Sequence, residues 1–462
     1  MVTTSQPNVR TARLWAPIRW IADFPRRSPA RASIAVFVLA AVLFTALLRL
    51  PFAAADGVAA PWEDATFTAS SAVTVTGLTS VDTGTSWSLF GHIVILLAIQ
   101  TGGLGIVTVA LLLTQAVTRR LGLGGRVFAQ QVMGATPLGD VKRLLKIVVL
   151  TTFIIEGALC ALLLPAFIVE DGWVRGPWHA LFYSISAFNN AGFVLDPGGL
   201  AVYSHNVWIM GVLMVGVIAG SLGFPVYLAV IAHLWGRGRW SLHTKLTVTT
   251  TLVLFLVGAV SWGASEWNNT ATIGTLNPLD RILHALFAST MMRSGGFAIV
   301  DTEQSTSTTL LLTDALMFVG GGSISTAGGI KVTTLAVLFL AIVAEARGTR
   351  DIAIFERRLP ESVLRVAISV TFLGASLVLA GTVLLTLTNR APLDHILFEV
   401  ISAFATCGLS VGLSADLDPF GKFVLSALML AGRVGPIGLA AALAVRQRTE
   451  HFTYPTDRPI LG

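Results

Sequence analysis

Long apolar segments separated by short polar connections dominate this sequence. Eight of them come close to or exceed the roughly 20 apolar residues that a helix needs to cross a bilayer. They are residues 33–51, 87–114, 144–168, 207–234, 246–262, 308–343, 363–387 and 422–445. The sixth is interrupted by a run of Gly, Ser and Thr residues, so it is predicted as a broken span. The pattern predicts an all-α polytopic membrane protein.

Four shorter apolar stretches lie between these segments. They are residues 62–73, 177–188, 279–291 and 392–404. Each has about 12 residues, which is too few to cross the hydrocarbon. Each also starts at or next to a Pro, which suits the first turn of a helix because its missing N–H has no partner there. The four stretches are therefore predicted as half-helices that enter the membrane and turn back.

One unit of sequence recurs four times, as span, half-helix, Gly turn and span. From a Phe in the half-helix to the Gly of the turn there are 10 residues in three units and 9 in the third. The glycines are Gly77, Gly192, Gly296 and Gly408. The predicted divisions are a basic N-terminal segment (1–32), four units (33–118, 119–236, 237–345 with the broken second span, 346–446) and a C-terminal tail (447–462).

Composition supports this fold class and excludes others. The chain is 54% hydrophobic and 12% charged, whereas soluble domains carry about 25% charged residues. Most Lys and Arg residues fall on alternate connections, so the positive-inside rule places both termini in the cytoplasm. The net charge of +6 is explained by these loops and does not indicate nucleic acid. No metalloprotease, C-x-x-C or nucleophile-elbow motif is present, so no enzyme is predicted.

The repeated unit has the chemistry of a cation filter. A half-helix that enters from the outer face points its C-terminal end, with partial negative charge, toward the bilayer centre. The residues before each Gly offer backbone carbonyls, which can replace the hydration shell of an ion, and Gly allows a backbone that a Cβ would resist. Four such units predict a selectivity filter built with pseudo-fourfold symmetry around one ion pore.

The segments Thr74-Val-Thr-Gly-Leu78, Asn189-Asn-Ala-Gly-Phe193, Arg293-Ser-Gly-Gly-Phe297 and Ala405-Thr-Cys-Gly-Leu409 resemble the four filters of the Trk/Ktr/HKT potassium transporter superfamily. The resemblance covers about residues 33–446, and the single span before the first filter makes the chain most like the membrane subunit of Ktr systems (KtrB). The filter residues that it implies, with potassium at their carbonyls, are Thr74, Val75, Thr76, Gly77, Asn189, Asn190, Ala191, Gly192, Ser294, Gly295, Gly296, Ala405, Thr406, Cys407 and Gly408.

The broken sixth span and a charged residue in the eighth suggest a gate. The run from Gly320 to Gly329 cannot hold a good helix, and it lacks the spacing of a nucleotide P-loop. It resembles the intramembrane loop of the family, although Ser323-Ile324 departs from the small-residue or Pro pair expected there. The gate residues implied are Gly320, Gly321, Gly322, Ser323, Ser325, Thr326, Gly328, Gly329, Lys331 and Arg433.

Three of the charged residues leave alternatives open. A charge within a span is functional or paired by default. By resemblance Arg433 faces the cavity below the filter, and the alternative is an interhelical ion pair with Glu156 or Asp314. Lys331 either lines the path or braces the loop. Arg293 either buttresses the third filter or tunes its ion occupancy.

The resemblance implies potassium uptake across the plasma membrane (the bacterial inner membrane) by a multi-pass homodimer surrounded by lipid. It also implies a separate cytoplasmic ring of KtrA/TrkA-like RCK subunits that bind ATP, ADP or NAD(H), and it leaves open whether sodium takes part. Two alternatives remain, a channel or symporter for sodium or ammonium and a non-conducting scaffold. A metal site formed by His179, His284 and His395 is considered and set aside in favour of capping or packing roles.

Overall fold

The computed structural model describes residues 29–120, 141–236, 240–349 and 351–445. Most of the described chain is helical, and the connections between helices include one hairpin, whose two strands are β1 (Ala353–Ile354) and β2 (Arg357–Arg358). The predicted N-terminal segment up to residue 28, the basic loop 121–140 and the tail from residue 446 lie outside the described residues. The all-α prediction is thus confirmed for the part that is described.

The first and fourth units have the predicted order of span, half-helix and span. The first unit contains α3 (Pro29–Leu48), η1 (Pro51–Ala53), α4 (Trp62–Thr74), α5 (Thr83–Ser86) and α6 (Leu89–Arg120). The fourth contains α15 (Glu361–Thr388), α16 (Leu393–Ala405), α17 (Leu413–Asp416) and α18 (Pro419–Val445). In both, the half-helix begins directly after a Pro at the N-cap. The two half-helices therefore begin within a residue or two of the predicted positions.

The second unit differs from the prediction at its second span. Its elements are α8 (Val141–Asn189), η2 (Gly199–Tyr203), α9 (Val207–Leu222) and α10 (Phe224–Leu234). Span and half-helix are joined in α8, which breaks at Gly172 with a φ of 78°. The prediction of an unbroken span over 207–234 is wrong, because α9 and α10 meet at 101°. Pro225 cannot donate a hydrogen bond and disfavours a continuous helix, and Gly223 adopts a φ of 89° at the bend.

The third unit contains the break predicted for the sixth span. Its elements are α11 (Leu242–Glu266), α12 (Pro278–Met291), η3 (Thr302–Gln304), α13 (Ser307–Met317) and α14 (Val332–Ala346). Polar side chains fix two of the helix starts, since Asn277 accepts a hydrogen bond from the Asp280 amide and Thr306 accepts one from Thr309. Such caps satisfy amides that have no partner within the helix. A loop of residues 318–331 connects α13 to α14.

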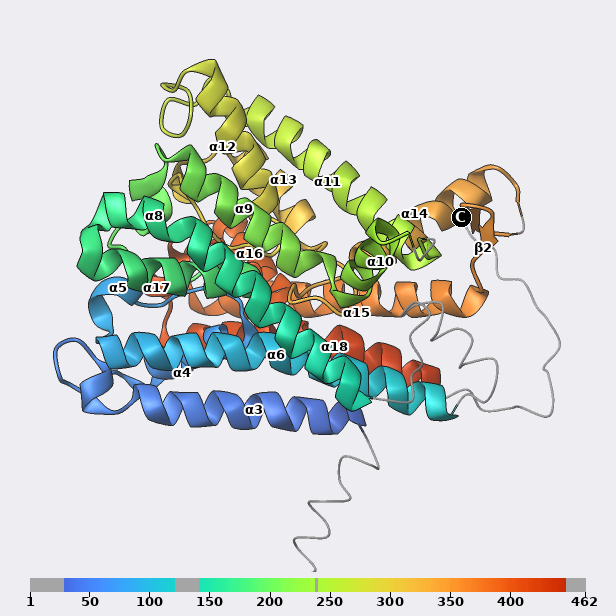
Figure 1. Ribbon diagram of the computed structural model, residues 1–462, viewed down its shortest axis with the longest axis horizontal. Helices are drawn as coiled ribbons and strands as arrows, with labels where there is room; N and C mark the ends of the chain where they lie inside the picture. Colours follow the sequence, from blue (N-terminus) through green and yellow to red (C-terminus); the bar gives the residue numbers. More distant parts are fainter. Residues whose placement is uncertain (1–28, 121–140, 237–239, 350, 446–462) are drawn as a thin grey trace, which may run out of the picture.

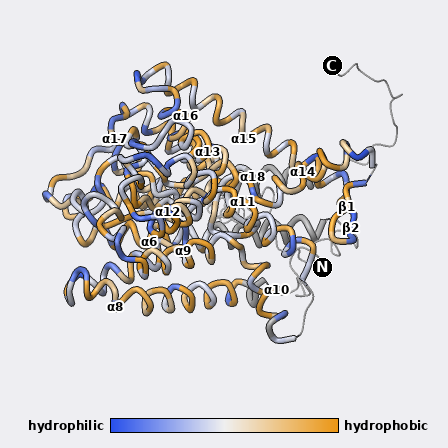
Figure 2. Tube along the Cα trace, turned by 90° about the horizontal axis from the view of Figure 1, so that it is seen from above, coloured by the Kyte–Doolittle hydropathy of each residue, from blue (hydrophilic) through white to orange (hydrophobic). Residues whose placement is uncertain are grey.

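Length and composition mark only some of the described helices as complete spans. Three pass both tests (Leu145–Asn189, Leu242–Glu266 and Glu361–Thr388), and the bent pair α9–α10 makes a fourth if it is counted as one. Shorter apolar helices occupy Ser33–Leu48, Leu89–Gly105 and Val332–Ala346. The total of eight spans therefore stays a prediction. Figure 2 shows hydrophobic residues along α8 and α15, whereas hydrophilic residues gather toward the two ends of the molecule.

The units pack in a cyclic order. The second span of each unit contacts the half-helix of the next: α6 contacts α8, α9 contacts α12, α13 contacts α16, and α18 contacts α4. Helices α3, α6 and α18 lie side by side although they come from opposite ends of the chain (Figure 1). The Phe of each Phe-to-Gly repeat is fully buried; these are Phe67, Phe182, Phe287 and Phe398. The recurring Phe thus anchors each half-helix in the core.

Candidate functional site

The four half-helices end in turns of the same backbone shape. Each of the four repeat glycines has a positive φ, between 67° and 96°, and so does the residue two positions before it. Those preceding residues are Val75, Asn190, Ser294 and Thr406. Left-handed backbone is costly for β-branched residues, so neighbouring structure must hold Val75 and Thr406 in place. Every residue of the predicted filter is buried.

The turns meet around one centre. A Cβ added to any of the four glycines would collide with the backbone of the following unit. The nearest carbonyls in that unit are those of Ala191 for Gly77, Gly295 for Gly192, Cys407 for Gly296 and Thr76 for Gly408. The last pair joins the fourth unit to the first, so the series closes. The structure therefore brings together all four segments that the sequence singles out.

Glycines in the second spans allow these turns to sit close to the helices behind them. A Cβ on Gly102, Gly220 or Gly432 would collide with the carbonyl of a residue four positions before a repeat Gly. Those carbonyls belong to Val73, Phe188 and Phe404, respectively. The small-residue clusters of these spans thus serve close packing of a helix against the end of a half-helix.

Buried acidic residues hold the chain that leaves two of the turns. In the first unit, Asp64 accepts hydrogen bonds from Ser80 at 2.7 Å and from Lys422 at 2.8 Å. In the fourth, Glu399 accepts from Ser410, from the Val411 amide at 3.2 Å and from Ser414 at 2.8 Å. Sequence reasoning missed both roles. The position of Glu399 inside an apolar run could have indicated a structural role, since ionisable residues within a membrane are usually paired or functional.

A polar cluster supports the second turn from behind. The Asn189 amide donates to Gln100 at 3.0 Å and to Glu156 at 2.8 Å, and Gln100 itself donates to Glu156 at 3.1 Å. Glu156 is buried on α8. Its carboxylate is thus engaged by two amides, and the suggested ion pair between Glu156 and Arg433 does not form.

Arg293, at the third turn, contacts the neighbouring span. The residue is 2% exposed, and its guanidinium donates to the Thr251 carbonyl of α11 at 3.1 Å. Its Nε has no hydrogen-bond partner among the described residues. This contact ties the end of α12 to α11, and the role of Arg293 in the filter stays a prediction.

The loop between α13 and α14 is closed at its base by backbone hydrogen bonds. The Gly320 amide donates to the Ile330 carbonyl at 2.8 Å, and the Val332 amide donates to the Gly321 carbonyl at 3.1 Å. Val319 and Ile330 also form an isolated bridge. These bonds satisfy backbone groups that unwinding of the span would leave unpaired, as a non-helical segment at membrane depth requires.

The same loop fills the bend between α9 and α10. The Gly322 amide donates to the Ser221 carbonyl at 2.7 Å, and the Phe224 amide donates to the Ile324 carbonyl at 3.2 Å. Ile324 is buried with a φ of 57°, an outlier for a β-branched residue. Ser323-Ile324, where the sequence departs from the residue pair expected for the family, therefore lies where the loop meets the bend.

The loop also contacts three of the four turns. Thr326 donates from its hydroxyl to Asn190 Oδ1 at 3.0 Å, and the Gly328 amide donates to the Ser294 hydroxyl at 3.3 Å. Ser294 donates in turn to the Thr406 carbonyl at 3.1 Å. A Cβ on Gly328 would collide with the Thr406 side chain. Gly328 thus has to be Gly for the loop to lie this close to the fourth turn.

Two cations contact successive carbonyls of the loop. Arg433, which is 2% exposed, donates to the Thr326 carbonyl, and Lys331 donates to the Ala327 carbonyl at 2.5 Å. The contact of Lys331 is the one that a bracing role requires. Arg433 forms no ion pair with Glu156 or Asp314 among the described residues, and its Nε and one terminal nitrogen have no hydrogen-bond partner there.

Apolar helices, half-helices and a buried ring of Gly turns define an all-α integral membrane protein. The profile of the TrkH family, described as a cation transport protein, matches residues 18–452, and the chain belongs to this family. The family is one of cation transporters and not of enzymes.

Named relatives and a solved structure agree with this assignment. The chain is 35% identical to the Ktr system potassium uptake protein B of Bacillus subtilis (strain 168), over 96% of this chain and 98% of that protein. It is 37% identical to the protein of the same name from Vibrio alginolyticus, over 90% and 91%. The crystal structure of the potassium transporter TrkH from Vibrio parahaemolyticus has the same fold, with a TM-score of 0.69, 19% identity, and coverage of 90% of this chain and 85% of that one.

Proposed function

We propose that this chain takes up potassium ions across the plasma membrane, through one pore surrounded by its four units (33–118, 119–236, 237–345 and 346–446). One observation carries the proposal: each repeat Gly lies against a carbonyl of the next unit, and the series closes from the fourth unit to the first. Two relatives that match over most of their length are named potassium uptake proteins.

The turns would act as the selectivity filter. Carbonyls of the predicted filter residues would replace the hydration shell of the ion, and the C-terminal ends of the half-helices would add partial negative charge around it. A filter with one shared Gly per unit discriminates by the number and spacing of its carbonyls. Potassium therefore has to be tested against sodium and ammonium as competitors. The alternative of a non-conducting scaffold does not explain the closed ring of turns.

The loop 318–331 and Arg433 would form the gate. The loop contacts the turns of three units and the bend of α9–α10, so it obstructs the path as long as these bonds hold. Arg433 keeps a positive charge beneath the filter and donates to the loop. A cation that leaves the filter is repelled by this charge until the loop and Arg433 move together. Inward flux would follow the membrane potential, which contributes about 2.3 kcal/mol per 100 mV for each charge.

Regulation would come from a partner. We infer that a ring of KtrA/TrkA-like RCK subunits docks on the cytoplasmic side of a homodimer and that their nucleotide, ATP, ADP or NAD(H), controls the gate. The names of the relatives place them in a Ktr system, and positive loops favour cytoplasmic termini. Sodium would act, if at all, as a second transported ion.

The test is uptake of radiolabelled rubidium into proteoliposomes that hold the purified chain, with potassium, sodium or ammonium as competitor. Potassium should block uptake best. Equal block by sodium would contradict potassium selectivity but keep the pore. If the chain alone shows no uptake, a variant that lacks residues 322–328 should restore it. Absence of uptake in both would favour the scaffold.

A matched pair of glycine variants separates the pore from the scaffold. Gly192→Ser adds a side chain where the second turn meets the third, whereas Gly211→Ser adds one on α9 where no atom lies within 4 Å. A pore should change its sodium-to-potassium ratio with the first variant and keep it with the second. A scaffold should respond to neither.

A further inference from the structure

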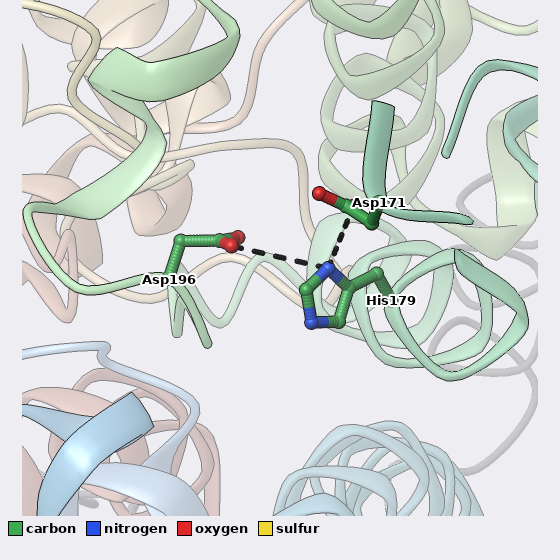
Figure 3. Close-up of side chains that lie close together, drawn as sticks. All are labelled: Asp171, His179 and Asp196. Atoms are coloured by element: carbon green, nitrogen blue, oxygen red, sulfur yellow. Dashed lines mark hydrogen bonds and ion pairs between the residues drawn. The ribbon is translucent and has the colours of Figure 1, made fainter. Parts of the chain in front are cut away.

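The outer part of the second unit holds a cluster of metal-ligating side chains that the proposed transport does not use. Asp171 lies at the end of the first span, His179 near the start of the half-helix, and Asp196 four residues after Gly192 (Figure 3). One ligand atom of each lies within 4.8 Å of the others. The break at Gly172 is what folds Asp171 back toward His179.

The three side chains point at a common centre. His179 Nδ1 lies 2.9 Å from Asp171 Oδ2 and 3.9 Å from Asp196 Oδ1. Of the three histidines at related positions, His179 joins such a cluster, whereas His284 contacts a carbonyl of its own helix. His179 is 8% exposed, so this imidazole is held between two carboxylates rather than in solvent.

Two phenols hold the carboxylates in position. Tyr203 donates to Asp171 at 2.9 Å, and Tyr183 donates to Asp196 at 2.6 Å while it accepts from the Leu195 amide at 3.1 Å. Such outer hydrogen bonds orient metal ligands and tune their affinity.

The charges of the cluster call for a cation. Among the described residues, neither Asp171 nor Asp196 pairs with a Lys or Arg, and His179 is the partner of both. The two carboxylates therefore lie close together with no ammonium or guanidinium group of the described chain beside them. Partly buried like charges repel each other strongly, and a divalent ion between them would remove the repulsion.

We propose that Asp171, His179 and Asp196 bind a divalent transition-metal ion of the zinc type at the outer face. One imidazole nitrogen with two carboxylate oxygens is a donor set that suits zinc, whereas magnesium and calcium prefer oxygen alone. The ion would take His179 Nδ1 in place of the proton that this atom shares with Asp171. Ligands at about 2.0–2.2 Å from a tetrahedral ion lie about 3.4 Å apart. The 2.9 Å contact between His179 and Asp171 would therefore open slightly, and the wider separations, which reach at most 4.8 Å, would close.

The ion would add a further link between three parts of the second unit: the end of the span, the half-helix and the chain that leaves the second turn. It would stiffen the outer mouth of the proposed filter. It would also add positive charge there, which lowers the local concentration of cations. Zinc on the outer side should therefore slow rubidium uptake.

Direct metal binding tests the site without any transport measurement. Purified protein, treated with a chelator and returned to metal-free buffer at pH 7, is titrated with zinc chloride by calorimetry. We expect one zinc per chain, weak binding of magnesium or calcium, and an affinity at least about tenfold lower for His179→Gln or Asp196→Asn. His205→Gln is the matched control, because His205 is an exposed outer histidine that contacts Glu170 and lies outside the cluster.

Melting temperatures show whether a variant that loses zinc binding is still folded. Without metal, each variant should melt within a few degrees of the parent. A variant that melts lower is replaced in the test by Tyr203→Phe, which removes a single hydroxyl. Parent protein that binds zinc no more tightly than His179→Gln overturns the proposal, and so does equal weakening by His205→Gln. Because binding is measured on its own, failed uptake leaves this test unaffected, and failed zinc binding leaves the potassium proposal unaffected.

Discussion

The hydroxyl of Thr326 donates to Asn190 Oδ1 at 3.0 Å, although the two residues are 136 positions apart in the chain. The first lies in the loop between α13 and α14 and the second in the turn that ends the second half-helix. The Phe188 carbonyl, at 3.3 Å, is a second acceptor within reach of the same hydroxyl proton. The proposed gate is thus bonded directly to the proposed filter, and movement of the loop has to break these contacts.

Thr326→Val should open the gate more often. The substitution keeps the size of the side chain and removes the one hydrogen bond that the hydroxyl can donate, worth about 1 kcal/mol. We expect rubidium uptake to rise severalfold in proteoliposomes without a partner subunit. The matched control is Thr386→Val, because the Thr386 hydroxyl donates to the Thr382 carbonyl of its own helix, α15. Uptake that stays at the parent level in both would contradict a latch at Thr326.

Gly408→Ala should damage the filter. Gly408 has a φ of 94°, and an added Cβ would collide with the Thr76 carbonyl. Backbone strain alone costs about 1–2 kcal/mol, and the carbonyl has to move away from its position. We expect loss of the preference for potassium over sodium in competition assays, whereas Gly211→Ala on α9 should behave like the parent. A variant that keeps full potassium preference would argue against the ring of carbonyls.

Arg433→Gln should raise basal uptake. The variant removes the positive charge beneath the proposed filter while an amide can still donate to the Thr326 carbonyl. The uptake rate is compared with that of Arg365→Gln, in which the lost charge belongs to an exposed pair with Glu361 on α15. Equal uptake by Arg433→Gln and the parent would show that the charge of Arg433 is not the barrier.

Lys422→Met should destabilise the protein, and Asp64→Asn should partly rescue it. The two side chains form a buried ion pair at 2.8 Å that joins α18 to α4. Removal of one partner from a buried pair costs about 3–5 kcal/mol, because the other charge is left without compensation. Melting in detergent should fall clearly for Lys422→Met and recover toward the parent in the double variant. A double variant that melts as low as the single one would count against a structural pair.

The sequence was sufficient for the local elements of this protein. Half-helices that start at Pro and end at Gly depend on residues within one short stretch, so their boundaries could be predicted to within a few residues. The run of Gly and Ser in the sixth span likewise cannot support a helix. The bend at Gly223 was missed, because a single Gly-Phe-Pro step inside an apolar stretch also fits a kinked but continuous span.

Contacts between the units could not be predicted from the sequence. Lys422 and Asp64 are 358 positions apart, and no periodicity links two such residues. The contact of Arg433 was equally out of reach, since the sequence suggested only a cavity-facing charge or an ion pair with Glu156 or Asp314, and the packing places the Thr326 carbonyl beside it.

The sequence by itself determined the class of protein, the four repeated units and the residues at each turn, because hydrophobic length, Pro and Gly act locally on the backbone. The tertiary structure alone decided that each turn lies against the next unit, that the loop rests in the bend of α9–α10, and that His179 meets two carboxylates. The reason is that these contacts depend on how separate helices pack, and packing is a property of the whole chain.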